Sequence, residues 1–278
     1  MKHRKRILFW ILVSLFMIYV LFPIYWLINS SFKTEKEIFL FNSTFYPHEF
    51  TCNNYRTVLF MRRGDVNFMA YFSNSLIVAM TTVILSIFIG GLAAYGISRS
   101  KSRVIYILPL IFLAFSLTPP QAYVNPLYLM MKYLKLLDTK LSLIIIYTLF
   151  SMPLPIWFLS QYFKGIPEEL EEAAKIDGCT RLQVISKIVL PLSSPGISVS
   201  AIFVFMFAWN EFFLAGIFTS TSGAMTLPIG IMNFQQLHSI SWNLTTAASM
   251  LAVFPLVIII SIFQRYIIQG LTAGALKG

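Results

Sequence analysis

The sequence predicts an all-α polytopic membrane protein, and its composition and its apolar patterning carry this prediction. Of the 278 residues, 57% are hydrophobic and only 12% are charged, whereas soluble domains are about 45–50% apolar and about 25% charged. A soluble fold of this composition would expose large apolar patches and aggregate. The apolar residues also fall into six long runs, which is the pattern of a chain that crosses a bilayer several times.

Six runs are long enough to form transmembrane helices, each of which needs about 20 predominantly apolar residues. They cover residues 7–28, 72–97, 104–125, 141–163, 196–218 and 244–263. The purely apolar part of the third run stops near Leu117, so we expect that span to continue into Pro119 and Pro120. The six spans predict one transmembrane domain over residues 1–278, whose longest cytoplasmic loop covers residues 164–194.

The distribution of Lys and Arg predicts the orientation, because cytoplasmic loops carry an excess of both. With the N-terminus in the cytoplasm, the four inside segments carry 13 basic residues and the longer outside segments carry 8. Six spans then return the C-terminus to the cytoplasm. Cys52 and Cys179 fall on opposite sides of the membrane and cannot pair. The first apolar run is too long for a signal peptide and lacks a cleavage site, so we expect an uncleaved first span.

Several classes of chemistry have no support in the sequence. The net charge of +10 is dispersed between apolar runs, so it offers no basic face for nucleic acid. The three histidines, His3, His48 and His238, lie in three different segments and have no metal-ligand spacing. No GxxxxGK[ST], HExxH or GxSxG motif occurs. We therefore expect no catalytic residue, no metal and no cofactor on this chain.

The loop between the fourth and fifth spans is predicted to form two short helices. Pro167 suits a first helical position, and the glutamates that follow it favour the positive end of the helix dipole. Gly178 is expected to end this helix in a left-handed conformation. Thr180 opens the second helix and forms a capping box with Gln183. Pro191 is expected to end it.

The acidic character of the first loop helix bears on what it contacts. An amphipathic helix that lies on a membrane surface prefers Lys and Arg on its polar face. This helix carries Glu168, Glu169, Glu171 and Glu172 instead. A groove on a protein partner fits this composition better, since an amphipathic helix can lay its apolar stripe into such a groove. A helix that lies on the bilayer remains the alternative.

The same loop carries a motif of known spacing. Glu172-Ala173-Ala174 is followed after three residues by Gly178, and after nine more by Ile188-Val-Leu190-Pro191. This spacing resembles the EAA loop of ABC importer permeases. Two further stretches resemble the maltose-type carbohydrate permeases: Trp209-Asn210-Glu211-Phe212, and Gln264-Arg265-Tyr266 with the glycine-rich tail Gly270–Gly278.

The resemblance implies a fold, partners and roles for particular residues. It implies an ABC importer permease fold in a bacterial cytoplasmic (inner) membrane. It also implies a second homologous permease subunit, two ATPase subunits that bind ATP and Mg, and an extracytoplasmic sugar-binding protein. The cargo would be a carbohydrate; an oligosaccharide, a monosaccharide or a glycerol-phosphate-like molecule would all fit. The first loop helix would be the coupling helix that docks on the ATPase. The ATPase-coupling residues would be Glu172, Ala173, Ala174, Gly178, Ile188, Leu190 and Pro191, with Gly270, Gly274 and Gly278 of the C-terminal tail near the ATPase pair.

Glu211 is the acidic residue predicted inside a span, and such residues usually face a bundle interior or a water-filled cavity. We expect Asn210 and Glu211 to face the pathway or the partner permease; an interhelical hydrogen-bond clamp is the structural alternative. An ion-coupled secondary transporter is the competing function, but such proteins usually need several intramembrane ionisable residues and inverted repeats. A membrane scaffold that uses the loop only for docking is a further alternative.

Overall fold

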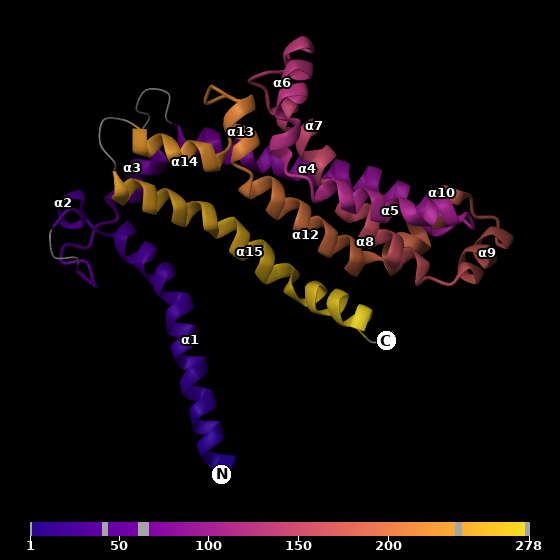
Figure 1. Ribbon diagram of the computed structural model, residues 1–278, viewed down its shortest axis with the longest axis horizontal. Helices are drawn as coiled ribbons and strands as arrows, with labels where there is room; N and C mark the ends of the chain where they lie inside the picture. Colours follow the sequence, from indigo (N-terminus) through magenta and orange to yellow (C-terminus); the bar gives the residue numbers. More distant parts are fainter. Residues whose placement is uncertain (1, 41–43, 61–66, 237–240, 276–278) are drawn as a thin grey trace. The chain divides into compact units, whose positions relative to one another are not determined.

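The computed structural model describes residues 2–40, 44–60, 67–236 and 241–275, and within these ranges the regular structure is helical, without β-strands. This agrees with the predicted all-α class. The chain divides into two compact units (Figure 1). Unit 1 comprises Met1–Met69 and Ile229–Pro255, and unit 2 comprises Ala70–Pro228 and Leu256–Gly278.

In unit 1, two asparagine side chains, each on a later helix, join these helices to the end of the first helix. It contains α1 (Lys2–Ser31), α2 (Glu35–Ile38), α3 (Asn53–Phe60), most of α14 (Leu227–Gln236) and the first part of α15 (Trp242–Ala275). The amide of Asn54 donates to the carbonyls of Ser31 and Lys33, at 2.8 Å each. Asn243 donates to the Asn54 carbonyl oxygen at 2.9 Å. One buried amide therefore links α1, α3 and α15.

Unit 2 is a helical bundle around α8. Its long helices are α4 (Phe68–Ser98), α5 (Arg103–Ser116), α7 (Lys140–Ser151), α8 (Pro153–Lys164) and α12 (Ser194–Asn210). The helix α8 contacts α5, α7 and α12, and Figure 1 shows α5, α8 and α12 running side by side. Fully buried side chains such as Tyr147, Leu159 and Phe163 form the interior. The shorter helices are η1 (Pro120–Tyr123), α6 (Val124–Tyr133) and α13 (Phe213–Phe218), together with those of the loop after α8.

The helices account for up to six membrane spans in the described part of the chain. Three are single helices: Lys5–Ser31, Phe68–Ser98 and Trp242–Gln264. The other three are bent pairs: Ile107–Ser116 with Pro120–Tyr133, Lys140–Ser151 with Pro153–Lys164, and Arg181–Leu192 with Ser194–Asn210. The number agrees with the six predicted runs, but the bends divide the third, fourth and fifth runs differently from the prediction.

The third predicted run, residues 104–125, does not form one continuous helix. The helix α5 ends at Ser116, and the helical segment Pro120–Tyr133 that follows is bent by 88° from it. Proline lacks the amide that would continue the helix, and it forces the preceding residue towards extended backbone. Pro119 accordingly has φ −62° and ψ 135°. The two prolines that we expected inside the span therefore redirect the chain.

The fourth and fifth runs are broken as well. Pro153 separates α7 from α8 with a bend of 46°. The fifth run was predicted as residues 196–218, but α12 ends at Asn210 and Glu211 adopts extended backbone with φ −68° and ψ 123°. Its carboxylate caps the next short helix, α13, so the chain changes direction where hydropathy alone indicates a continuous span.

Asp138 lies in the loop between α6 and α7 and binds the segment that follows α13. Its carboxylate accepts from the backbone amides of Ser220 (2.8 Å) and Thr221 (3.0 Å) and from the Thr221 hydroxyl (2.8 Å). Burial alone would raise the pKa of Asp138, but these three hydrogen bonds outweigh it and lower the pKa below its usual value. The turn before α7 and the segment after α13 are therefore joined.

Gly196 allows a close approach of α12 to α8. A Cβ at this position would lie 2.7 Å from the Cγ atom of Tyr162 on α8. We expect Gly196→Ala to lower the free energy of unfolding by about 1–3 kcal/mol, the usual cost of overpacking. Gly96→Ala in α4 is the matched control, since nothing lies within 4 Å of its Cβ. Thermal unfolding in detergent compares the two, and equal melting temperatures would show that Tyr162 moves aside freely.

Candidate functional site

The loop after α8 brings together most of the residues that the sequence singles out. It folds into α9 (Glu168–Ile176), α10 (Arg181–Val184), the π-helix η2 (Ile185–Val189) and α11 (Leu190–Leu192). Figure 1 shows α9 and α10 together at the end of unit 2, beyond the ends of α4 and α8. The loop thus forms a structured projection of the bundle.

The helix α9 begins and ends close to the predicted positions. Pro167 lies just before its first residue, one position earlier than predicted, with φ −56° and ψ 134°. Gly178 has φ +85°, which confirms the predicted left-handed stop. The amide of Gly178 donates to the Lys175 carbonyl at 3.1 Å, and that of Cys179 donates to the Ala174 carbonyl at 2.9 Å. This pair of bonds is the Schellman motif, which satisfies carbonyls that the helix leaves free.

The second loop helix also opens as predicted but ends later. The Thr180 hydroxyl accepts from the Gln183 amide, and the Gln183 side chain accepts from the Thr180 amide, so the capping box is confirmed. The helix then widens into η2 and continues through Pro191 to Leu192. Pro191 does not end it, because the change of register places this proline in the first turn of α11, where a missing amide removes no bond.

The two alanines of the EAA stretch have different surroundings. Ala174 is buried in a core cluster with Ala94, Leu159, Phe163, Ile166, Val184 and Val189. Ala173 and Glu172 are exposed. The alanine pair therefore does not form one docking surface: Ala174 attaches α9 to the bundle, and Ala173 lies on the outer face. Of the remaining motif residues, Ile188 packs against the cluster, whereas Leu190 and Pro191 are exposed.

A buried ion pair, which sequence reasoning missed, anchors α9 to the end of α4. The Arg99 guanidinium donates to Glu171 Oε1 from Nε at 2.8 Å and from Nη2 at 2.5 Å. The Tyr95 hydroxyl donates to Glu171 Oε2 at 2.7 Å. Arg99 also donates to the Phe163 carbonyl at 2.9 Å and to the Ile166 carbonyl at 3.3 Å. One side chain therefore joins α4, the end of α8 and α9.

The ion pair is mostly buried. The Arg99 side chain is 16% exposed and that of Glu171 only 4%. Burial alone would raise the pKa of Glu171, but the hydrogen bonds from Tyr95 and Arg99 outweigh burial and lower it. A signal for this residue existed in the sequence: Glu171 lies three positions before Ala174, so both belong to the same face of a helix. The sequence did not show that this face is the buried one.

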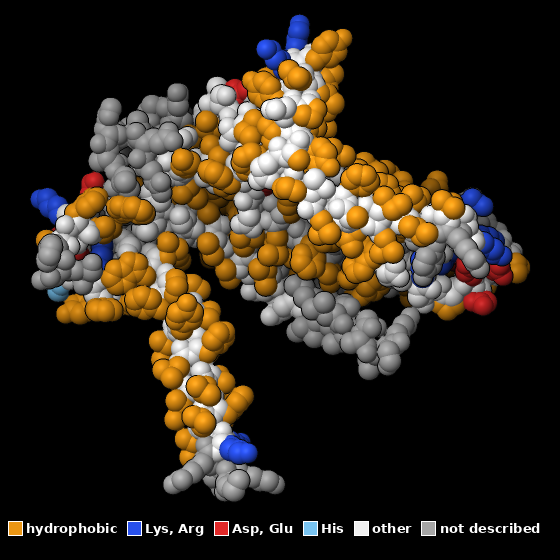
Figure 2. Space-filling view, viewed as in Figure 1, with side chains coloured by type: hydrophobic (Ala, Val, Ile, Leu, Met, Phe, Trp, Pro, Cys, Tyr) orange, Lys and Arg blue, Asp and Glu red, His pale blue; other side chains and the backbone are white. Residues whose placement is uncertain are grey.

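The outer face of the loop is charged and partly apolar. Figure 2 shows acidic and basic side chains gathered at the α9 and α10 end of unit 2. A cavity of about 460 Å³ beside the ion pair is lined by Leu92, Tyr95, Gly96, Arg99, Glu168, Glu171, Glu172, Lys175 and Arg181. Ile176 is 86% exposed and Leu182 is 75% exposed. Large apolar side chains exposed at the tip of a projection are typical of a protein contact.

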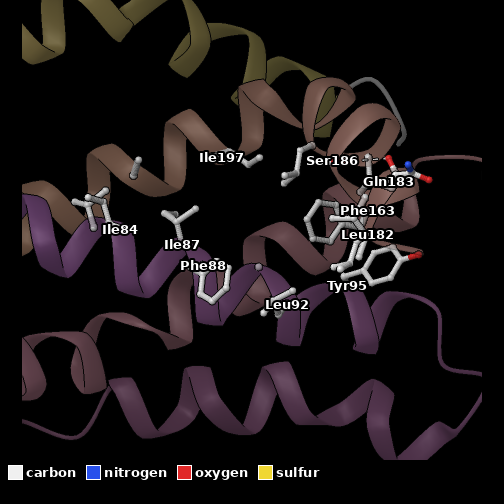
Figure 3. A pocket seen from close by; sticks show the side chains of 16 residues that line it. Ile84, Ile87, Phe88, Leu92, Tyr95, Phe163, Leu182, Gln183, Ser186 and Ile197 are labelled. Carbon is white, nitrogen blue, oxygen red and sulfur yellow. Dashed lines mark hydrogen bonds between the residues drawn. The ribbon is translucent and has the colours of Figure 1, made fainter. Parts of the chain in front are cut away.

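An apolar cavity of about 680 Å³ lies between α4, the loop helices and α12 (Figure 3). In the close-up, Ile87, Phe88 and Leu92 come from α4, and Phe163 and Leu182 lie at the loop end. Its walls are almost entirely apolar, so it offers few groups that would fix a polar ligand.

Glu211 lies apart from this loop and makes contacts within the bundle. Its Oε1 accepts from the Leu214 amide at 2.7 Å, and its Oε2 accepts from the Ala215 amide at 3.0 Å. The Tyr147 hydroxyl on α7 donates to Oε2 at 2.6 Å. Asn210 is exposed, and its amide donates back to the Met206 carbonyl at 2.8 Å. The interhelical clamp is therefore present, and a role of either residue in the pathway stays a prediction.

The predicted tail residues lie at the end of the described chain. Gly270 and Gly274 fall within α15, and Gly278 lies outside the described residues. Within the described ranges, no group of three or more His, Cys, Asp or Glu side chains could hold a metal ion.

Known proteins similar to this chain include permease proteins of transport systems. The trehalose/maltose transport system permease protein MalG of Thermococcus litoralis is 39% identical over 275 residues, covering 99% of this chain and 98% of the relative. The sulfoquinovosyl glycerol transport system permease protein SmoH of Agrobacterium fabrum is 37% identical and covers 96% of this chain and 93% of its own length. These relatives match along almost the whole of both chains.

The solved structures agree with the fold. A chain of a bacterial ABC transporter involved in the import of the acidic polysaccharide alginate superposes with a TM-score of 0.81 at 21% identity, covering 95% of this chain and 96% of that one. The family model described as binding-protein-dependent transport system inner membrane component matches residues 86–273. This description places the family in the inner membrane, in agreement with the up to six spans in the described part of this chain. This chain therefore belongs to the family of binding-protein-dependent transport system inner membrane components.

Proposed function

We propose that this chain is the membrane-spanning subunit of an ATP-driven importer that moves a carbohydrate, and specifically an oligosaccharide, into the cytoplasm. The observation that carries the proposal is α9: an acidic helix at the end of unit 2, with an exposed outer face and a buried attachment to α4. The relatives named for trehalose/maltose and for sulfoquinovosyl glycerol, and the alginate importer, support a carbohydrate cargo.

The partners follow from what this chain has to receive and transmit. Two ATPase subunits, which bind ATP and Mg, supply the free energy, and α9 is the helix that docks on one of them. Glu172 and Ala173 lie on its exposed face, Gly178 shapes its end, and Ala174 holds it to the bundle. A second, homologous permease completes the pathway, and an extracytoplasmic binding protein delivers the sugar. Movement of α9 changes the arrangement of the spans and gives alternating access.

This mechanism needs α9, and with it both termini, on the cytoplasmic side. Cys52 is exposed and precedes α3, and Cys179 is partly exposed and follows α9. We expect a membrane-impermeant maleimide to label Cys52 but not Cys179 in intact cells, and to label Cys179 once the membrane is permeabilised. Cys52→Ser and Cys179→Ser variants assign each signal. Labelling of Cys179 from outside would contradict the orientation.

The function is tested with the complex purified from native membranes with its ATPase, partner permease and binding protein. A panel of mono- and oligosaccharides is added with the binding protein, and ATP hydrolysis and sugar uptake into proteoliposomes are measured. We expect an oligosaccharide to stimulate hydrolysis, and uptake to stop when ATP or the ATPase subunit is omitted. Uptake that persists without ATP would contradict the proposal.

An ion-coupled secondary transporter is the alternative that such persistence would favour. Both oxygens of Glu211 accept hydrogen bonds from the chain itself. This geometry leaves the carboxylate engaged in the fold, and it therefore gives the ion-coupled mechanism no support.

A further inference from the structure

The attachment of α9 to the rest of the bundle rests on two kinds of contact. One is apolar: Ala174 packs into the cluster that includes Ala94 of α4. The other is polar and directional: Arg99 follows the last turn of α4 and holds Glu171 through two hydrogen bonds. Apolar packing resists separation but allows sliding. The carboxylate is held more directionally, because Arg99 donates twice to Oε1 and Tyr95 donates to Oε2.

The partners of Arg99 explain why the position requires an arginine. Its guanidinium group donates to the Glu171 carboxylate from Nε. It also donates from Nη1 to the Phe163 carbonyl and from Nη2 to the Ile166 carbonyl, at and just after the end of α8. Carbonyls at a helix C-terminus lack intrahelical donors. The Phe163 carbonyl accepts from the Ile166 amide at 3.1 Å, and Arg99 adds a second donor there. Lysine has one nitrogen and cannot reach both sets of acceptors. The guanidinium also lies 5.9 Å from the centre of the Tyr95 ring, whose hydroxyl donates to Glu171.

The Arg99–Glu171 pair lies where a movement of α9 can be passed on to α4. The short segment from Gly165 to Pro167 connects α9 covalently to α8, but α4 is reached only across space. A displacement of α9 is passed to α8 by the chain itself, and to α4 by the pair and the cluster. Since the Glu171 side chain is only 4% exposed, moving Arg99 away would leave a buried carboxylate without its counter-charge. The pair therefore resists displacement of α9 relative to the end of α4.

We propose that Arg99 and Glu171 are positioning residues that transmit the movement of the coupling helix α9 to the transmembrane helix α4. This inference rests on the proposed function. It predicts that loss of the pair uncouples ATP hydrolysis from sugar uptake, because α9 still docks on the ATPase but no longer moves α4 fully.

The test uses the complete complex in proteoliposomes and measures sugar uptake and ATP hydrolysis in the same preparation. The main variant is the double substitution Arg99→Met with Glu171→Leu, because it leaves no unpaired buried charge. Arg99→Lys and Glu171→Gln are milder variants that retain part of the contact. Lys101→Met is the matched control: it removes a positive charge two residues from Arg99, at an exposed position.

We expect the ratio of uptake to hydrolysis to fall by about tenfold in the double variant, within the range usual for coupling between two sites. The milder variants should fall less, and Lys101→Met should match the wild type. Because the residues act as a unit, Arg99→Met alone and the double variant should have the same ratio.

Two outcomes would overturn the inference: an unchanged ratio in the variants that assemble, or loss of assembly in all of them, which would show that the pair serves folding alone. A wild-type complex that takes up no sugar in response to ATP would contradict the proposed function itself. The same experiment therefore separates the two failures.

Discussion

Gly178→Val is expected to abolish sugar uptake while the complex still assembles. The backbone at Gly178 has φ +85°, and a β-branched residue is strongly disfavoured there. Nothing lies within 4 Å of a Cβ at this position, so the effect comes from backbone strain and not from collision. A residue forced into such a conformation costs about 1–3 kcal/mol, and reshaping the end of α9 relieves that cost. The outer face of α9 then no longer fits its partner.

Asparagine supplies the control for Gly178→Val, because it adopts left-handed backbone more readily than other residues with a Cβ. Gly178→Asn should keep most of the uptake. Ala173→Trp tests the same docking through bulk, since Ala173 is exposed and a tryptophan there alters the surface but not the core. The measurements are uptake, ATP hydrolysis and co-purification of the ATPase. Wild-type uptake in both Gly178→Val and Ala173→Trp would mean that this loop is not the coupling element.

Glu211→Ala is expected to prevent stable assembly. The carboxylate accepts from the amides of Leu214 and Ala215 and from the Tyr147 hydroxyl. Alanine leaves these three donors without that acceptor, and each buried unsatisfied group costs about 1–3 kcal/mol. The summed cost is a large part of the roughly 5–15 kcal/mol by which folded proteins are stable. The yield and the melting temperature of the purified complex measure the loss.

Graded substitutions separate the clamp from a role in the pathway. Tyr147→Phe removes one donor and leaves the cap of α13 in place, and Glu211→Gln keeps one acceptor oxygen. If Glu211 acts only as a clamp, melting temperatures should fall in the order Tyr147→Phe, Glu211→Gln, Glu211→Ala, and uptake per assembled complex should stay constant. A loss of uptake in Glu211→Gln at an unchanged melting temperature would assign the carboxylate to the pathway instead.

Local signals in the sequence predicted local structure well. The left-handed stop at Gly178 and the capping box of Thr180 and Gln183 depend on residues within a few positions of one another. Their physics is complete in a short segment, because the side chains satisfy nearby backbone groups. The six apolar runs are similar in kind, since their length and composition alone decide whether they suit a bilayer.

The parts that sequence reasoning missed depend on distant partners or on competition between signals. Arg99 and Glu171 are 72 positions apart, and neither differs in type from other loop charges. Only the packing of α9 onto α4 and α8 brings them together. At Glu211 the hydropathy pattern indicated a continuous helix, but a carboxylate in apolar surroundings needs donors. The first amides of α13 supply these donors, so α12 ends at Asn210, one residue before Glu211.

The apolar length of α1 has a consequence for biogenesis. Its Lys5–Ser31 stretch is 27 residues long and apolar enough to cross a membrane as one continuous helix. A transmembrane helix of this kind satisfies its own backbone and gains its stability from lipid, so it does not need the rest of the polypeptide to be finished. This first segment can leave the translocon while later segments are still being synthesised. A bent pair of helices lacks backbone hydrogen bonds at its break, so the three bent pairs need polar groups of neighbouring segments before they are stable in lipid.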